Sequence, residues 1–202
     1  TEVFLVNPTS FRQIHGSPFA YWVSERVRRL FQSLQPFESG GRTVKQGLAT
    51  ADDFRFVRCW WEVPPGLVLA GTRGASREWY IGETWNGKRW VTLSKGGATS
   101  AFYDDPSLVV NWADDGADIK EFVVTTPGTS HWSRRVVNHQ FYFLPGFSWA
   151  VRSARFSPYA VPEGCIFSVS RYQGFADEKD RLCVIGLLNG IMVDALLRLS
   201  SE

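Results

Sequence analysis

Phe54-Arg-Phe-Val-Arg-Cys-Trp-Trp61 opens a region, extending to about Ser170, in which short apolar runs alternate with turn residues. Such runs, rich in β-branched and aromatic residues, are typical of short strands. The further predicted strands are Leu67–Ala70, Arg89–Leu93, Leu108–Trp112, Ile119–Val124 and Asn138–Leu144. The predicted turns are Pro64-Pro65-Gly66, Asn86-Gly87, Asp115-Gly116, Pro127-Gly128 and Pro145-Gly146, of which Asn86-Gly87 suits a two-residue hairpin. We predict a bent, mixed or antiparallel sheet with long loops.

Helical patterns flank this region on both sides. Ser17-Pro18 resembles a helix start, and the apolar residues after it recur every three or four positions until Pro36, which predicts an amphipathic helix. From about Glu178 to Leu199 the apolar residues lie almost all the way round a helix. Such a helix is expected to be buried, either in the core of this chain or against a surface outside it, with Gly186, Asn189 and Gly190 marking a break or a close helix contact. The fold class is therefore α+β, divided into residues 1–46, 47–176 and 177–202.

The composition of the 202 residues suits one globular domain with a substantial core. A net charge of +2 does not by itself indicate a nucleic-acid partner, but the charges are unevenly distributed. No Asp or Glu occurs between Phe122 and Pro162, whereas Asp104 to Glu121 is strongly acidic. The three cysteines, Cys59, Cys165 and Cys183, are odd in number and widely spaced, which favours reduced core thiols in a cytoplasmic protein. No leader sequence and no membrane-spanning segment are predicted.

Three segments gather Gly, Lys, Arg, Asn and aromatic residues: Lys45–Arg58, Ser94–Gly97 and Asn138–Trp149. Arg and Lys neutralise phosphates, and a glycine pair such as Gly96-Gly97 lets the backbone approach a phosphate closely. The arginines at 134, 135, 152 and 155 are consistent with a nucleic-acid surface, and equally with a solvated basic face.

Several motifs imitate those of reaction chemistry. Asn7-Pro8-Thr9-Ser10 lacks the second proline and the aromatic of a base-holding methyltransferase loop, and Phe37–Gly41 lacks the spacing of a cofactor-binding glycine loop. His131 and His139 have no partners at metal-ligand spacing. Asp104 with Asp118 and Lys120 imitates the acids and lysine of a metal-dependent nuclease, which stays an alternative.

An ordered series of short motifs along the chain indicates a resemblance to a known family. It comprises Gly16–Ser24, Gly47–Thr50, Asp53–Arg58, Trp60–Glu62, Lys95–Gly97, Val109–Trp112, Asp115-Gly116, Tyr142-Phe143, Gly146–Trp149, Arg155-Phe156 and Pro162–Phe167. The series resembles the C-terminal specificity region of adenine-specific DNA methyltransferases of BREX phage-defence systems and of type IIG restriction-modification enzymes. The resemblance covers nearly the whole chain.

In that family a separate N-terminal domain binds S-adenosylmethionine and methylates adenine, while the C-terminal region selects the DNA sequence. The resemblance therefore implies a target-recognition domain that holds no cofactor or metal itself. Its partners would be double-stranded DNA, the methyltransferase domain of the same parent chain and other defence-system proteins, but no membrane. Residues 1–46 would link to the methyltransferase domain. Another alternative is a protein-interaction module of a defence complex.

The resemblance also implies roles for individual residues. Gly47, Leu48, Thr50 and Asp53 would shape the turn that joins the catalytic and recognition halves, and the Gly146–Trp149 turn would hold a DNA-facing loop. A departure from the family pattern occurs at Ala101–Asp104, where Trp-Tyr-Gly is usual. Together with the charge distribution, the resemblance predicts DNA contacts by Arg42, Lys45, Thr50, Arg55, Lys95, Gly96, Gly97, Arg134, Arg135, Asn138, Ser148, Arg152 and Arg155.

Overall fold

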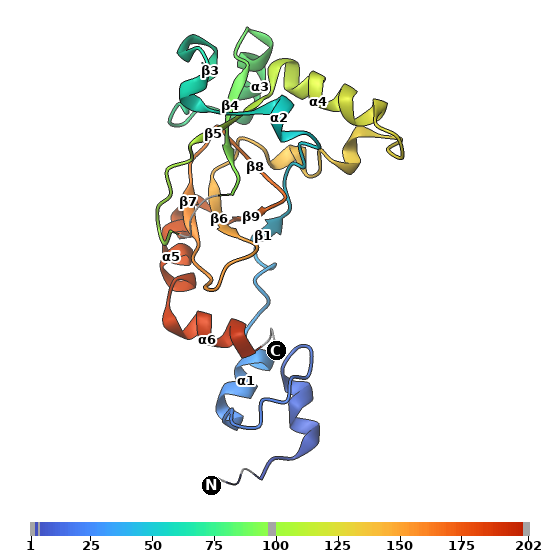
Figure 1. The fold of residues 1–202 in the computed structure, drawn as a ribbon. Helices are drawn as coiled ribbons and strands as arrows, with labels where there is room; N and C mark the ends of the chain where they lie inside the picture. Colours follow the sequence, from blue (N-terminus) through green and yellow to red (C-terminus); the bar gives the residue numbers. More distant parts are fainter. Residues whose placement is uncertain (1–2, 4, 97–99, 200–202) are drawn as a thin grey trace.

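The computed structural model describes residues 3, 5–96 and 100–199, and it contains two β-sheets in its middle and upper parts (Figure 1). One sheet is antiparallel, in the order β1 (Thr43–Lys45), β9 (Arg171–Phe175), β6 (Gly146–Ala150) and β7 (Tyr159–Val161). The other has the order β2 (Val57–Cys59), β5 (Leu108–Asn111), β4 (Trp90–Ser94) and β3 (Val68–Leu69), with β8 (Cys165–Phe167) also paired to β4. In it, β3 and β8 run parallel to β4 and the other pairs are antiparallel. The expected α+β fold with mixed and antiparallel strands is confirmed.

The main core lies around the five-stranded sheet. Two helices, α3 (Arg77–Trp85) and α4 (Ala113–Thr125), contribute Tyr80, Ile119 and Val123 to it. Trp112 is fully buried at the end of β5. The predicted strands at 67–70, 89–93 and 108–112 are confirmed as β3, β4 and β5, because their apolar side chains enter this core.

The N-terminal residues form a small cluster at the lower end of the molecule, and Leu199 from the C-terminal end of the chain packs against it (Figure 1). The 3-10 helix η1 (Pro8–Gln13) is joined to α1 (Glu25–Ser33) by the buried guanidinium of Arg28, which donates to the carbonyl of Val23 and to the hydroxyl of Ser10. The predicted helix start at Ser17-Pro18 is wrong: Ser17 has a positive φ, and the N-cap of α1 is Ser24. The helix ends at Ser33, before Pro36.

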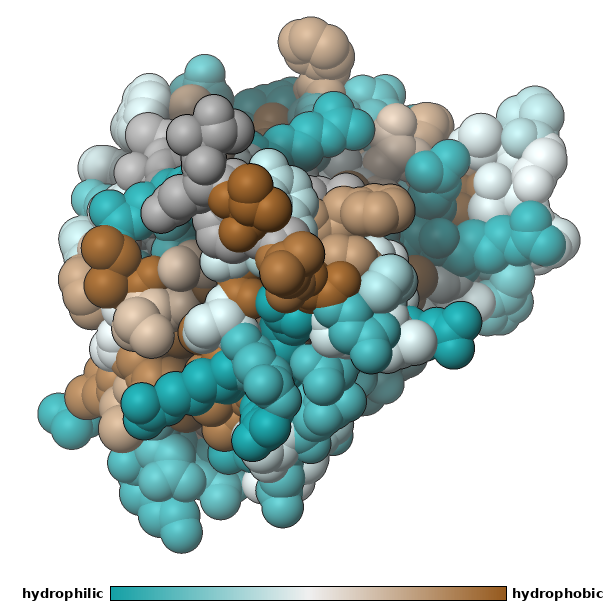
Figure 2. All heavy atoms as spheres, turned by 90° about the horizontal axis from the view of Figure 1, so that it is seen from below, coloured by the Kyte–Doolittle hydropathy of each residue, from teal (hydrophilic) through white to brown (hydrophobic). Residues whose placement is uncertain are grey.

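The C-terminal apolar pattern forms two helices, α5 (Glu178–Leu188) and α6 (Ile191–Leu199), bent by 71°. The expected break therefore falls at Asn189 and Gly190. The expectation that these apolar residues are buried in the core of this chain is wrong for most of them, because the side chains of Leu182, Leu187, Ile191 and Met192 are exposed. Figure 2, seen from the lower end, shows apolar side chains gathered among hydrophilic ones. Within the described residues no single helix could cross a membrane, although the bent pair passes by length and composition.

The prediction of a strand at Ile119–Val124 is wrong, because these residues belong to α4. Ile119 and Val123 are four residues apart, so a helix places both side chains on one face, toward the core. The β-branched run indicated a strand, but burial on this face outweighs the local preference. The predicted turn at Asp115-Gly116 exists inside the first part of α4, where residues 114–116 all have positive φ.

Two further predicted strands are replaced largely by helical turns. Residues 54–61 divide into α2 (Asp53–Phe56), β2 and the 3-10 helix η2 (Trp60–Glu62), since Asp52 caps α2 through the amide of Arg55. Residues 138–144 contain η5 (His139–Phe141), which begins at the left-handed Asn138 and follows η4 (Trp132–Arg134). One more 3-10 helix, η3 (Pro65–Leu67), precedes β3.

Asn86-Gly87 does not form a hairpin. Asn86 is the C-cap of α3, and Gly87 takes the left-handed conformation that commonly ends a helix. The pair thus joins a helix to β4. The turn signal was real, but sequence alone did not identify the element before it.

The three cysteines differ in environment, so the prediction of three core thiols is correct only for Cys165. Cys183 is exposed and Cys59 is partly exposed. Burial, and then the nearby Glu163, raise the pKa of the Cys165 thiol to about 12.

We expect the thiols to react in a fixed order. Because the thiolate is the reactive form, at pH 8 a thiol reagent such as dithionitrobenzoate should modify Cys183 rapidly and Cys165 only after unfolding. Absorbance stopped-flow measures the phases, and Cys183→Ser should remove the fastest one. A native-state reaction of all three thiols at one rate would contradict the described burial.

Candidate nucleic-acid interface

Four segments that are far apart in the sequence meet where the two sheets join. The amide of Leu48 donates to the carbonyl of Phe167 (2.8 Å), and the amide of Val169 donates to the carbonyl of Leu48 (2.9 Å). The next residue of the same segment, Ala49, donates its amide to the carbonyl of Arg135 (2.9 Å). The amide of Ser168 in turn donates to the carbonyl of Ser94 (3.0 Å). We call residues 46–50, 94–96, 135–138 and 167–171 the seam.

Gly47 permits the close packing of the seam. A Cβ atom built on Gly47 would lie 1.9 Å from the carbonyl oxygen of Phe167 and 2.5 Å from its carbonyl carbon. Both are backbone atoms of a buried strand, so they cannot move aside as a flexible side chain would. The Gly47–Thr50 motif therefore has a packing role that is visible only in three dimensions.

A polar cluster adjoins the seam. The carboxylate of Asp53, in α2, accepts hydrogen bonds from the ammonium of Lys95 and the hydroxyl of Thr50. Partial burial acts to raise the pKa of Asp53, but these two hydrogen bonds outweigh it, so the pKa lies below its ordinary value. Lys95 is thus held next to the backbone of Gly96, with its charge partly neutralised in the unbound protein.

Arg171 holds the connection between β4 and β5 at two points. Its side chain is 2% exposed, its Nε donates to the carbonyl of Gly96, and its Nη1 lies 3.3 Å from the carboxylate of Asp104. The guanidinium also lies over the ring of Tyr159, whose hydroxyl shares a hydrogen bond of 2.6 Å with Ser94. Arg171 therefore positions the segment that carries Lys95 and Gly96.

Exposed basic groups border the same region. Arg134 and Arg135 are exposed, and Arg55 in α2 lies over the ring of Phe122 at 4.9 Å. The side chain of Asn138 donates to the carbonyl of Gln46 (2.9 Å), so part of its hydrogen-bonding capacity holds the seam together. The structure thus brings together the following predicted contact residues: Lys45, Thr50, Arg55, Lys95, Gly96, Arg134, Arg135 and Asn138. Gly97 lies outside the described residues.

Other predicted contact residues lie elsewhere. Arg42 donates to the carbonyl of Phe37, in the segment before β1. Arg152 and Arg155 are exposed in the loop after β6, on the side of α6. Ser148 is fully buried and donates to the carbonyl of Tyr172 (2.8 Å). The expected turn at Gly146–Trp149 is wrong, because these residues belong to β6 inside the antiparallel sheet.

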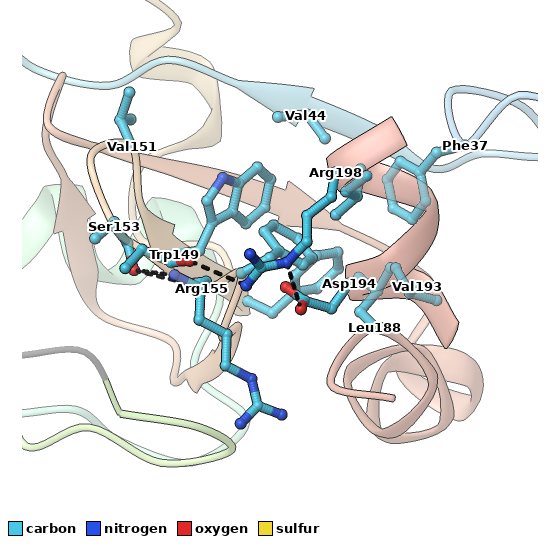
Figure 3. Close-up of a pocket in the computed structure, with 15 residues that line it drawn as sticks. Phe37, Val44, Trp149, Val151, Ser153, Arg155, Leu188, Val193, Asp194 and Arg198 are labelled. Atoms are coloured by element: carbon cyan, nitrogen blue, oxygen red, sulfur yellow. Dashed lines mark hydrogen bonds and ion pairs between the residues drawn. The ribbon is translucent and has the colours of Figure 1, made fainter. Parts of the chain in front are cut away.

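A cavity of about 670 Å³ lies between this sheet, the loop at 151–156 and the α5–α6 pair. Figure 3 shows Phe37, Trp149 and Leu188 around it, while Arg198 reaches across to the loop at 153–155. The Arg198 guanidinium binds Asp194 (3.0 Å) and the carbonyl of Ala154 (3.3 Å). The cavity wall is mainly apolar, which distinguishes it from the polar seam.

The residues of the nuclease alternative are engaged in other pairs. Asp104 binds Arg171, whereas Asp118 accepts from Asn111 (2.9 Å) and lies 3.7 Å from Arg89. Lys120 binds Asp115 (2.7 Å). It does not face Asp118, because residues two apart on a helix point in different directions. In residues 3, 5–96 and 100–199, no three His, Cys, Asp or Glu side chains are grouped to hold a metal ion.

Sequence reasoning missed two residues of this region, Arg171 and Phe54. No local pattern marks Arg171 as the residue that anchors Gly96 and Asp104. Phe54 was assigned to a strand, yet its side chain is 95% exposed beside Asp53. The apolar residues on both faces of 54–59 were the only signal against a regular half-buried strand.

Comparison with known proteins finds two relatives of this chain. No protein-family model matches the chain. It is 28% identical over 205 residues, 98% of this chain, to the adenine-specific methyltransferase PglX of Lacticaseibacillus casei (strain Zhang). It is 27% identical over 180 residues, 88% of this chain, to the adenine-specific methyltransferase BrxX of Escherichia coli O9:H4 (strain HS). The chain spans only 16% and 13% of the lengths of these relatives. The predicted resemblance to adenine-specific methyltransferases is confirmed by these two relatives.

Proposed function

We propose that this chain is a DNA target-recognition domain of an adenine-specific DNA methyltransferase of a phage-defence system. The observation that carries the proposal is the seam, which brings the exposed Arg135, with Arg134 beside it, together with the Lys95-Gly96 backbone from segments far apart in the sequence. The similarity to two adenine-specific methyltransferases over nearly the whole chain supports the same assignment. Recognition of DNA requires such a surface, because phosphate contacts fix the register in which bases are read.

Methyl transfer itself is assigned to another part of such an enzyme. The glycines at 40 and 41 come before β1, so they do not follow a strand and open a helix as a nucleotide-type cofactor loop does. The residues at this position do not fit S-adenosylmethionine, and we derive no chemical step from this chain. Its proposed contribution is to hold the duplex while the catalytic part extrudes an adenine.

Each group of the interface has a proposed role. Arg134 and Arg135 would neutralise phosphates, and the exposed Gly96 would let the backbone approach the duplex. Lys95 would exchange part of its interaction with Asp53 for a phosphate, helped by the hydrogen bond that Thr50 retains to the same carboxylate. Arg171 would keep this segment in place without touching DNA.

Charge reversal tests this function. Arg134→Glu with Arg135→Glu should weaken binding of the 202-residue protein to duplex DNA at least tenfold at low salt. The slope of the logarithm of the binding constant against the logarithm of salt concentration should become shallower by about 0.9 for each phosphate that the variant no longer neutralises. Fluorescence anisotropy at several salt concentrations measures both quantities.

The matched control is Arg12→Glu with Arg26→Glu, which changes the net charge equally but lies in the exposed N-terminal cluster. It should leave the slope nearly unchanged. Equal effects of the two double variants would mean that only the overall charge matters. Absence of binding by the unaltered protein at low salt would overturn the proposed function.

The exposed apolar side chains of α5 and α6 favour a second candidate, a contact with protein. In this alternative the chain docks on another domain of the enzyme or on another defence protein. Substituting Leu187 and Ile191 by serine would then disrupt a protein complex, whereas charge reversal at Arg134 and Arg135 would leave DNA binding unchanged. Under the first proposal the charge-reversed variant loses DNA binding.

A further inference from the structure

Phe54 is the most exposed aromatic side chain beside the seam. Its side chain is 95% exposed, although it lies between two residues that make defined contacts, Asp53 and Arg55. Single exposed apolar residues are common on protein surfaces, so exposure alone indicates little. Two further observations indicate a binding role for Phe54: its backbone is held in place by neighbouring residues, and charged side chains lie near it.

The backbone at Phe54 is held on both sides. Asp53 binds Lys95 and Thr50, and Asp52 accepts from the amide of Arg55 (3.1 Å). Phe56 is buried, and its ring centroid lies 5.4 Å from that of Phe122 in α4. A short, fixed turn therefore presents the ring, so little conformational entropy would be lost when the ring is buried by a partner.

Cationic groups outnumber acidic ones around this turn, because Asp52 and Asp53 are offset by Arg55, Arg58 and Lys95. The guanidinium of Arg55 lies 5.2 Å from the ring centre of Phe56 and 4.9 Å from that of Phe122. Arg58 donates to the carbonyl of Phe54 (2.6 Å), which places a second guanidinium next to the same residue. A partner suited to this site combines negative charge with flat apolar faces, and nucleic acid does so through its phosphates and bases.

We propose that Phe54 is a wedge that inserts between adjacent base pairs of bound duplex DNA and partly unstacks them. The inference rests on the proposed DNA-recognition function and extends it to a deformation of the duplex. Arg55 and Arg58 contact the phosphates on either side of the opened step. Apolar side chains that act in this way kink the duplex, and unstacking at one step assists the extrusion of a nearby base.

The test separates binding from unstacking. The 202-residue protein is mixed with a long duplex of mixed sequence, and permanganate, which oxidises unstacked thymines, maps opened steps, while anisotropy measures affinity. The unaltered protein should produce reactive thymines. Phe54→Ala should bind about tenfold more weakly and, at saturating protein concentration, produce none, because stacking on an aromatic ring is lost. Phe54→Leu should retain much of the reactivity, since leucine also acts as a wedge.

Phe19→Ala is the matched control, because Phe19 is 81% exposed in the N-terminal cluster, away from the seam. It should change neither affinity nor reactivity. Equal reactivity of Phe54→Ala and the unaltered protein, or binding without any reactive thymine, would overturn the wedge and leave DNA recognition intact. Failure of the unaltered protein to bind DNA would overturn both.

Discussion

Replacing Arg171 by leucine is expected to lower the free energy of unfolding by about 3 kcal/mol, the lower end of the range for breaking a buried ion pair. Three partners lose their interaction at once: the carboxylate of Asp104, the carbonyl of Gly96 and the ring of Tyr159. Asp104 is a quarter exposed, so water solvates part of the charge left behind, which keeps the loss from being larger. For a domain whose total stability is about 5–15 kcal/mol, this is a large fraction.

Urea denaturation followed by tryptophan fluorescence measures the effect. Arg29→Leu is the matched control, because Arg29 is exposed and pairs with Glu25 one helical turn away. An exposed pair contributes about 0.5 kcal/mol at most, so the control should unfold at nearly the original urea concentration. Arg171→Lys should fall between the two, since lysine keeps the charge but lacks the planar fork. Unfolding of Arg171→Leu together with the control would refute the anchoring role of Arg171.

Gly47→Ala is the second change with a large expected effect, a loss of about 3 kcal/mol or more. The added methyl would meet the backbone of Phe167 at 1.9 Å, so residues 46–50 would have to separate from β8. Insertion of a methyl into a well-packed core typically costs about 1–3 kcal/mol, and here no flexible side chain can relieve the contact. The separation would also break the hydrogen bonds between Leu48 and its partners in the seam.

The chain contains a matched control for this change as well. Gly82 lies within α3, and a Cβ there would have no atom within 4 Å. Gly82→Ala should therefore raise the stability by about 0.5–1 kcal/mol, since alanine is the better helix former. Thermal and urea unfolding of both variants give the comparison. Similar small effects of the two substitutions would show that the seam is not closely packed at Gly47.

The outcome for the strands shows which sequence signals were decisive. The runs at 89–93 and 108–112 were predicted correctly because β-branched and other apolar residues are concentrated in them, and both strands are largely buried in the sheet. The run at 119–124 was misread, since Ile119 and Val123 satisfy helical spacing and strand composition together. Residues 114–116 are left-handed, with Gly116 packed against the ring of Trp112, and burial of Ile119 and Val123 on one face then favours the helix.

Some residues of the candidate site could be predicted from local sequence, and others could not. Local sequence was enough to suggest a basic, glycine-containing surface with Lys95, Arg134 and Arg135, because charge and glycine content are properties of a short segment. It placed Ser148 on the same surface, whereas β6 buries that residue. Phe54 and Arg171 were missed, since their significance depends on neighbours from other segments.

By itself, the sequence determined the α+β class, the positions of β3 to β5 and the similarity to adenine-specific methyltransferases, and it narrowed a break in the C-terminal helix to Gly186, Asn189 and Gly190. Each of these depends on side chains within a few residues of one another, or on an ordered series of motifs. Tertiary structure alone decided that residues 46–50 lie between β8 and the 135–138 segment, that Arg171 anchors Gly96 and Asp104, and that Phe54 is exposed. The physical reason is that hydrogen bonds and burial are set by distance in space, which a linear pattern does not contain.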